Sequence, residues 1–165
     1  VSKLDKILEL ISDGKTLALV SDAGTPTISD PGSVLVSKIR EVYPDIEIIA
    51  IPGASALVSA LSVSGLPASE FVFLGFLPHK KGRETLFKEI SEMKRTVVFY
   101  ESPHRIMKTL EALVKFCPDK KVCVARELTK IYEEFITDTP ENVLKYYEEN
   151  KDKVRGEYTV LVGNA

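Results

Sequence analysis

The chain of 165 residues has no tryptophan and only two cysteines, Cys117 and Cys123. Two cysteines are too few for a disulfide framework, and their spacing matches no metal site, so we expect a reducing, cytoplasmic environment and no bound metal. Neither sign of charge is in excess, because 22 Lys and Arg stand against 24 Asp and Glu. This balance excludes a polyanion-binding tail, so any nucleic-acid contact must come from a local patch.

The sequence also lacks a convincing membrane segment. Ile48–Ser69 carries no charged residue, but Pro52, Gly53, Gly65 and Pro67 interrupt it. A buried strand, a turn and a helix of small residues explain this stretch better than a membrane span. The first thirteen residues carry five charges, which excludes the core of a signal peptide. Apolar residues make up 44% of the chain, enough for one large domain or two small ones.

The first part of the chain alternates helical and strand-like patterns. Apolar residues at helical spacing alternate with short continuous apolar runs, and this order predicts a parallel sheet covered by helices. The expected elements are a helix over 4–11 ending at Gly14, a strand over 16–20, a helix over 34–42, a strand over 46–51 and a helix over 57–61.

Beyond Gly65-Leu-Pro67 the pattern changes, because strands follow one another with less helix between them. We expect a mixed sheet here and a boundary near Pro67–Glu70, giving an α/β protein with domains 1–68 and 69–165. Most basic residues, seventeen of the 22, lie in the second domain. The expected strands are 71–76, 96–100, 122–125, 131–137 and 158–162, and the expected helices are 86–93, 103–114 and 140–147.

Two turn-rich loops follow the expected strands of the first domain. Ser21–Gly32 contains Gly24, which lets a ligand approach the backbone, and two aspartates, which suit a cationic ligand. The structural alternative is a capped helix start with Ser29 or Asp30 as N-cap and Pro31 in the first turn. Pro52–Ala56 leads into a helix whose free backbone N–H groups could hold a polar ligand, although close packing of small residues is the favoured explanation for this segment taken alone.

Taken together, these loops and four further segments resemble the 16S ribosomal RNA (cytidine-2′-O)-methyltransferase branch of the tetrapyrrole methylase superfamily. The resemblance runs across nearly the whole chain, and the matching segments occur in the family's order. The further segments are Phe99–Arg105, Ala125–Lys130, the Gly75–Pro78 turn and Gly156-Glu157 before the last strand.

The resemblance implies a methyltransferase that uses S-adenosylmethionine and has two α/β domains with the cofactor in the cleft between them. Its reaction transfers a methyl group to the ribose 2′-hydroxyl of a cytidine in 16S ribosomal RNA, as naked RNA or within the small ribosomal subunit. The family is typically homodimeric. A methylase of tetrapyrroles, other small molecules or proteins has the same fold, and an inactive dimerising module is a further alternative.

The resemblance also assigns residues. Thr25 stands where many tetrapyrrole enzymes have Asp, which favours the RNA branch. The residues implied for the cofactor are Ala23, Gly24, Thr25, Ile28, Ser55, Ala56, Tyr100, Glu127 and Glu157.

Methyl transfer to a hydroxyl requires alignment and a base that removes the proton. Asp30 and Glu101 are the two candidate bases, and Arg126 could orient a phosphate or carboxylate with its planar fork. The basic turn before residue 84 provides phosphate contacts in this interpretation, whereas a solvated turn is the structural alternative. The expected RNA contacts are His79, Lys80, Lys81, Arg83 and Arg105.

One departure from the family is expected to affect the first domain. The family opens with a Thr-Pro-Ile-Gly-Asn-type turn and has a Glu-Asp-Thr-Arg-type segment further on, and neither occurs in residues 1–165. We therefore expect an incomplete first-domain sheet that lacks several strands and one wall of the cleft.

Overall fold

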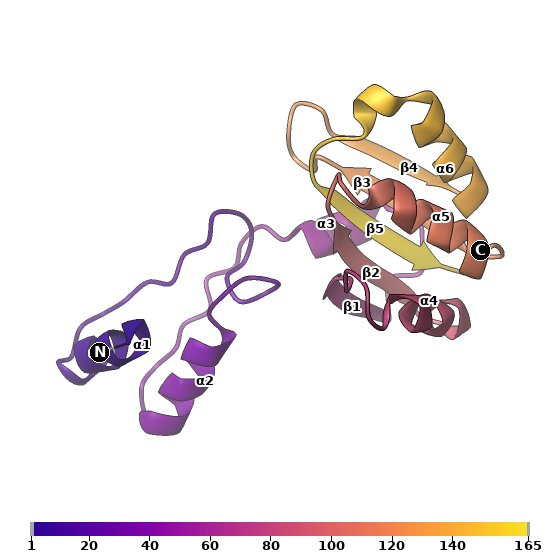
Figure 1. Cartoon of the computed structure of the whole chain (residues 1–165). Helices are drawn as coiled ribbons and strands as arrows, with labels where there is room; N and C mark the ends of the chain where they lie inside the picture. The colour runs from indigo at the N-terminus through magenta and orange to yellow at the C-terminus, as the bar shows by residue number, and fades with distance from the viewer. Residues whose placement is uncertain (1, 165) are drawn as a thin grey trace. The chain divides into compact units, whose positions relative to one another are not determined.

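A computed structural model describes residues 2–164 and divides the chain into two compact units, residues 1–55 and 56–165. This division falls earlier than the boundary predicted near Pro67–Glu70, because α3 (Ala56–Val63) packs against a strand of the second unit. Most of the secondary structure belongs to the second unit (Figure 1).

The first unit has two helices, α1 (Lys3–Ser12) and α2 (Ser33–Val42). Ser2 caps α1 reciprocally with Asp5, each side chain accepting a hydrogen bond from the other residue's backbone N–H. Gly14, at φ 74°, ends the helix in the left-handed conformation, as predicted. The N-cap of α2 is Gly32, so neither Ser29 nor Asp30 caps this helix.

The strands predicted over 16–20 and 46–51 are absent. Both segments lack strand pairing, although they are rich in β-branched and aliphatic residues. Val20 and Ile51 are 81% and 78% exposed, so neither segment is buried on a sheet. A strand exists only through hydrogen bonds to a neighbour, and residues 2–164 offer these segments none. The first unit therefore has the helices that local signals specify and not the sheet between them.

The second unit is built on one five-stranded mixed sheet, which confirms the predicted mixed architecture. Its order is β1-β2-β5-β3-β4; β1 and β2 are parallel, and the other three pairs are antiparallel. The last strand, β5, therefore lies at the centre of the sheet, and all six of its residues are buried. The strands are β1 (Phe71–Phe76), β2 (Thr96–Glu101), β3 (Lys121–Arg126), β4 (Glu134–Asp138) and β5 (Tyr158–Gly163).

Helices cover both faces of this sheet. One face packs against α3 through Leu57, Ala60 and Leu61, and the other carries the larger core (Figure 1). Tyr147 and Phe87 are among the largest side chains in that core. The helices of the larger core are α4 (Arg83–Glu92), α5 (Ile106–Phe116) and α6 (Pro140–Glu149), and a short 3₁₀ helix, η1 (Lys151–Lys153), follows them.

Both cysteines lie in the second unit and are buried. Cys117 follows α5, and Cys123 lies in β3. Burial raises the pKa of the Cys117 thiol to about 11 and also raises the pKa of the Cys123 thiol. Both therefore remain protonated thiols at neutral pH.

Tyr147 provides a test of this core. Its hydroxyl is buried without a hydrogen-bond partner, and burial, as the main cause, raises its pKa strongly. We expect Tyr147→Phe to leave the free energy of unfolding unchanged or to raise it by up to about 1 kcal/mol, because no bond is lost.

Tyr158→Phe is the matched control, since the Tyr158 hydroxyl donates to the Lys153 carbonyl at 2.8 Å. That change should cost about 1 kcal/mol. Urea denaturation of both variants measures the difference, and a larger loss in Tyr147→Phe would contradict the assignment.

Candidate functional site

The Ser21–Gly32 loop of the first unit has an unusual backbone. Thr27 and Ser29 lie in the left-handed region at φ 74° and 58°, and Gly24 does so at φ 72°. The Ser21 hydroxyl donates to the carbonyls of Ala23 and Gly24 at 3.2 and 3.0 Å. Non-glycine residues in this region cluster where the surrounding structure holds a loop in a functional conformation.

This loop contacts the second predicted loop of the same unit. The Thr25 hydroxyl donates to the Ala54 carbonyl at 3.0 Å, and a Cβ added at Gly24 would lie 3.5 Å from the same oxygen. The two loops thus lie side by side, although the strands that were expected to carry them do not form. Ala23, Gly24 and Thr25, all implied for the cofactor, belong to this contact region.

The remaining candidates of the first unit lie near it in the sequence. Ile28 is 44% exposed, and Asp30 is half-buried in the same loop. Ser55 follows Ala54 directly, whereas Ala56 begins α3 in the second unit. The roles predicted for these residues stay predictions.

In the second unit, the candidates Glu101 and Arg126 belong to one row of four residues that crosses the sheet at one end of its strands. Glu101 pairs with Tyr158, Tyr158 with Arg126, and Arg126 with Glu134. Directly opposed residues project to the same face of a sheet, here the face that α5 and α6 cover. Tyr100 is one residue earlier and therefore projects to the opposite face. The sequence did not reveal that Tyr100 and Arg126 are separated by the sheet.

Arg126 belongs to a buried polar group of this row. Its guanidinium Nε lies 3.5 Å from Glu134, and its side chain is 6% exposed. Glu134 also accepts from the Tyr146 hydroxyl at 2.6 Å and from Lys153 at 2.5 Å. Burial raises the pKa of Glu134, but the hydrogen bonds from Lys153 and Tyr146 outweigh it, so the net pKa is lowered. The Glu134 carboxylate is therefore ionised and holds Arg126 within the unit.

Glu101 lies at the other end of the row, and its side chain is fully buried. Its carboxylate accepts from the Ser102 backbone N–H and the Thr109 hydroxyl, and it pairs with Arg105 at 2.6 Å. A general base must reach the proton that it removes. This position therefore fits poorly with the expected role of Glu101 as a base.

Glu127 and Glu157 are joined by a lysine. Lys130 contacts the carboxylates of Glu127 and Glu157 at 3.0 and 2.9 Å. The pKa of Glu127 is lowered, first by a hydrogen bond from the Glu157 backbone and then by Lys130. The pKa of Lys130 is raised by these same two acids, first by Glu157. Lys130 is consequently a cation and not a base.

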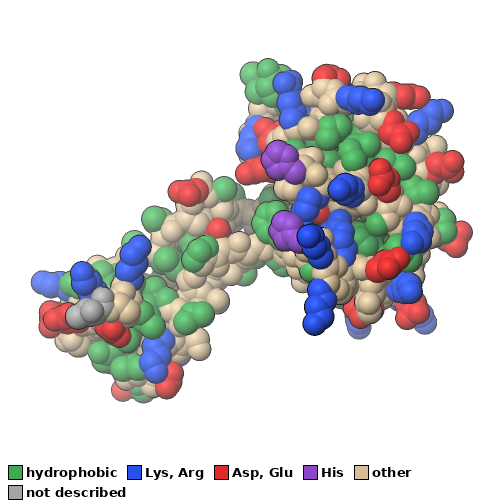
Figure 2. Space-filling model, viewed as in Figure 1, with side chains coloured by type: hydrophobic (Ala, Val, Ile, Leu, Met, Phe, Trp, Pro, Cys, Tyr) green, Lys and Arg blue, Asp and Glu red, His purple; other side chains and the backbone are tan. Residues whose placement is uncertain are grey.

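The expected RNA contacts, in the basic turn between β1 and α4 and at the start of α5, divide into two kinds of residue. His79, Lys80 and Lys81 are exposed, whereas the side chains of Arg83 and Arg105 are only 16% and 15% exposed. Figure 2 shows the histidines among Lys and Arg side chains on one face of this unit. The turn therefore offers its lysines to a polyanion and keeps its arginine mostly inside.

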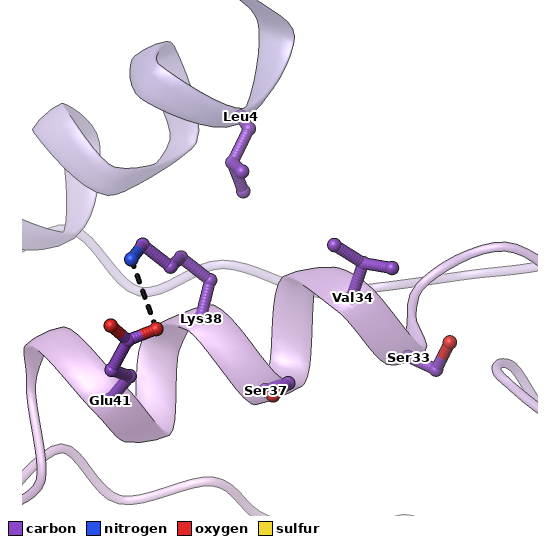
Figure 3. A pocket seen from close by; sticks show the side chains of 6 residues that line it. All are labelled: Leu4, Ser33, Val34, Ser37, Lys38 and Glu41. Carbon is purple, nitrogen blue, oxygen red and sulfur yellow. Dashed lines mark hydrogen bonds and ion pairs between the residues drawn. The ribbon is translucent and has the colours of Figure 1, made fainter.

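The first unit also contains a hollow of about 430 Å³ between α1 and α2 (Figure 3). Leu4 reaches toward it from α1, and the Lys38–Glu41 ion pair lies on α2. None of its lining residues was a candidate. They are Leu4, Ser33, Val34, Ser37, Lys38 and Glu41.

Residues 2–164 contain neither a group of metal ligands nor a membrane-spanning helix. No three His, Cys, Asp or Glu side chains of this range are grouped so that they could hold a metal ion. Within the same range, every helix is too short or too polar to cross a bilayer.

The sequence alone did not reveal two residues that support candidate side chains of the site. Thr109 bonds to Glu101, and the spacing of eight residues between a strand end and a helix gave no signal. Gly156 was noted only as part of a motif, but a Cβ there would lie 2.5 Å from the Glu127 side chain. The glycine itself was the detectable signal, since a glycine before a strand often marks a positive φ, which here is 87°.

Comparison with known proteins identifies the family. The model of the Tetrapyrrole (Corrin/Porphyrin) Methylases matches residues 3–143, most of the chain. The chain belongs to the tetrapyrrole methylase family. The predicted family is thereby confirmed.

Two relatives show which members of this family the chain is similar to. "Ribosomal RNA small subunit methyltransferase I" of Thermotoga maritima is 44% identical over 161 residues, covering 97% of this chain and 70% of that protein. The protein of the same name from Bacillus subtilis is 41% identical over 158 residues, covering 95% of this chain and 53% of that protein. The chain thus spans between half and seven tenths of the length of these relatives.

Solved tetrapyrrole methylases share the fold. The methyltransferase CobJ superposes with a TM-score of 0.68 at 22% identity, covering all of this chain and 72% of that chain. Uroporphyrin-III C-methyl transferase from Thermus thermophilus, complexed with S-adenyl homocysteine, gives a TM-score of 0.59 at 16% identity, covering 96% and 70%. The predicted α/β fold class is confirmed.

Gly156 allows a test of how closely the Glu127 side chain packs against the backbone before β5. Gly156→Ala should lower the free energy of unfolding by more than Gly65→Ala, because both glycines have positive φ but only Gly156 also faces a side chain at 2.5 Å. The conformational strain alone costs about 1–2 kcal/mol, and the displaced Glu127 adds roughly 1–3 kcal/mol. Chemical denaturation compares the two variants, and equal losses would show that Glu127 moves freely.

Proposed function

We propose that this chain forms part of an enzyme that uses S-adenosylmethionine to methylate a ribose 2′-hydroxyl of a cytidine in 16S ribosomal RNA. The observation that carries the proposal is the identity of 41–44% to proteins named ribosomal RNA small subunit methyltransferase I over nearly the whole chain. The exposed lysines of the basic turn support an RNA substrate over a tetrapyrrole, because phosphate contacts need such a surface.

The residues of the first unit fit this cofactor. Ala23 and Gly24 are exposed and small, so backbone groups are accessible beside the Thr25–Ala54 contact. The chain between Lys15 and Lys38 carries acids and no base, which suits a positively charged sulfonium. Similarity adds Ile28 and Ser55 of this unit, and Ala56, Tyr100, Glu127 and Glu157 of the second unit, as cofactor contacts.

The cofactor, when bound, supplies an activated methyl group on a sulfonium. The protein's part is to align the ribose oxygen with that group, and alignment of this kind can contribute roughly 7–11 kcal/mol. Of the two candidate bases we favour Asp30, because it is partly accessible in the loop, whereas Glu101 is buried and paired. A base at this position accepts the hydroxyl proton and adds roughly 10²–10⁴-fold to the rate.

The partners follow from the same proposal. The substrate is 16S ribosomal RNA, naked or within the small ribosomal subunit, and the protein acts in the cytoplasm as a homodimer. Sedimentation velocity of the purified chain tests the dimer.

Thr25→Val tests the cofactor loops. Losing the hydroxyl removes the 3.0 Å bond to Ala54, so the two loops separate more easily. We expect the dissociation constant for S-adenosylmethionine to rise roughly three- to tenfold, as the loss of about one hydrogen bond predicts. Isothermal titration calorimetry measures it, with Thr85→Val on exposed α4 as the control. No heat of binding to the unaltered protein at millimolar ligand would refute the assignment of this cofactor to the chain.

Lys80→Glu combined with Lys81→Glu tests the RNA surface. Loss of two phosphate contacts should weaken RNA binding and reduce the slope of log K against log salt by about 2, while cofactor affinity stays unchanged. The matched control is Lys145→Glu with Lys151→Glu, which makes the same charge change near α6. Filter binding with a 16S RNA fragment distinguishes them, and equal weakening by both pairs would mean that only net charge matters.

A further inference from the structure

Three elements meet at one buried carboxylate, that of Glu101 at the end of β2. On one oxygen it accepts from the Ser102 N–H at 2.8 Å and pairs with Arg105 at 2.6 Å. On the other it accepts from the Thr109 hydroxyl at 2.7 Å, and Arg83 lies 3.5 Å away. Every partner lies at or near the start of α4 or α5, so this acid joins both helix starts to the sheet.

Both arginines also hold the backbone that leads into the basic turn. Arg105 donates to the Leu77 carbonyl at 2.9 Å, and Arg83 donates to the Pro78 carbonyl at 3.1 Å. Leu77 and Pro78 immediately precede His79, the first residue of the exposed basic turn. The planar guanidinium fork makes this possible, since one terminal nitrogen of each arginine contacts the acid and the other donates to a carbonyl.

The cluster has an electrostatic consequence. Two guanidinium groups share a single carboxylate, and the Arg105 Nε is buried without a partner. Removing the carboxylate's charge would leave two cations close together with little water to solvate them. The arginines would then separate, and the carbonyls of Leu77 and Pro78 would lose their fixed donors.

We infer that Glu101 is a positioning residue for RNA: through Arg83 and Arg105 it fixes the basic turn against the start of α5, so that the exposed cations present one phosphate-binding surface. The exposed cations are Lys80 and Lys81 on the turn and Lys108 in α5, and the exposed imidazoles of His79 and His104 add hydrogen-bonding groups on the turn and just before α5. The inference deepens the proposed function and rests on it. It reassigns Glu101 from base to support, and Arg83 and Arg105 from RNA contacts to the buried frame beneath them.

The decisive experiment compares Glu101→Gln with Glu84→Gln. Both remove one negative charge, but Glu84 is 68% exposed on α4, where it pairs with Lys115. Simple charge attraction predicts that both variants bind RNA more tightly. The positioning role predicts the opposite sign for Glu101→Gln, a roughly tenfold weaker affinity, while Glu84→Gln binds as tightly as the unaltered protein or more so.

Hydrogen exchange of the free protein gives a second readout that does not depend on RNA. The amides of Leu77 and of residues 79–82 should exchange faster in Glu101→Gln and at the original rate in Glu84→Gln. Unchanged exchange in this segment, or RNA affinity of Glu101→Gln equal to or above the original, overturns the inference. If the unaltered protein binds no RNA, the proposed function fails, and the exchange result still decides whether Glu101 fixes the turn.

A second variant covers the case in which Glu101→Gln does not fold. Arg83→Lys keeps the positive charge but lacks the fork that contacts both Glu101 and the Pro78 carbonyl. It should reproduce the faster exchange of residues 77–82 and a weaker RNA affinity at an unchanged affinity for S-adenosylmethionine. Original exchange rates in a folded Arg83→Lys protein also overturn the inference.

Discussion

A charge buried within a protein must be neutralised and hydrogen-bonded, and this constraint organises one end of the second unit. Glu101 satisfies it with two arginines, a threonine and a backbone N–H, whereas the partly buried Glu134 is hydrogen-bonded by Lys153 and Tyr146 and lies 3.5 Å from Arg126. The two acids stand at opposite ends of one row across the sheet. The helices α4, α5 and α6 are tied to the sheet by these charges as well as by apolar packing.

The same constraint separates residues that look alike in the sequence. Lys80 and Arg83 lie in one basic run, yet one is exposed and the other contacts a buried acid. Glu101 and Asp30 are both acids of turn-rich segments, but only Asp30 retains partial access to solvent. Residue type alone therefore does not tell whether a charged group contacts a ligand or holds the frame beside it.

Sequence patterns predicted the elements whose signals are local. The end of α1 near Gly14 and the start of α6 at Pro140 were predicted, because helix stop signals and proline act within a few residues. The second-unit strands were also predicted, from short runs rich in β-branched and aromatic residues, and of these strands β2, β3 and β5 are largely buried. The runs at 16–20 and 46–51 have the same composition and form no strand, because a strand depends on a partner that composition does not reveal.

For the candidate site, too, local features could be predicted from the sequence, whereas contacts that depend on strand pairing could not. Both loops were predicted from their places after successive apolar runs, and the structure brings them together at Thr25 and Ala54. The separation of Tyr100 and Arg126 by the sheet was not predicted, because it depends on strand register. The partners of Glu101 could not be predicted either, since Arg83 and Thr109 lie in two different helices.

The state of the two cysteines has a practical consequence for following this molecule. Thiol-directed reagents react with the thiolate, and both native thiols are buried and protonated at neutral pH. A single cysteine introduced on the solvent side of the protein would thus carry a fluorophore or spin label selectively, with the native pair left in place.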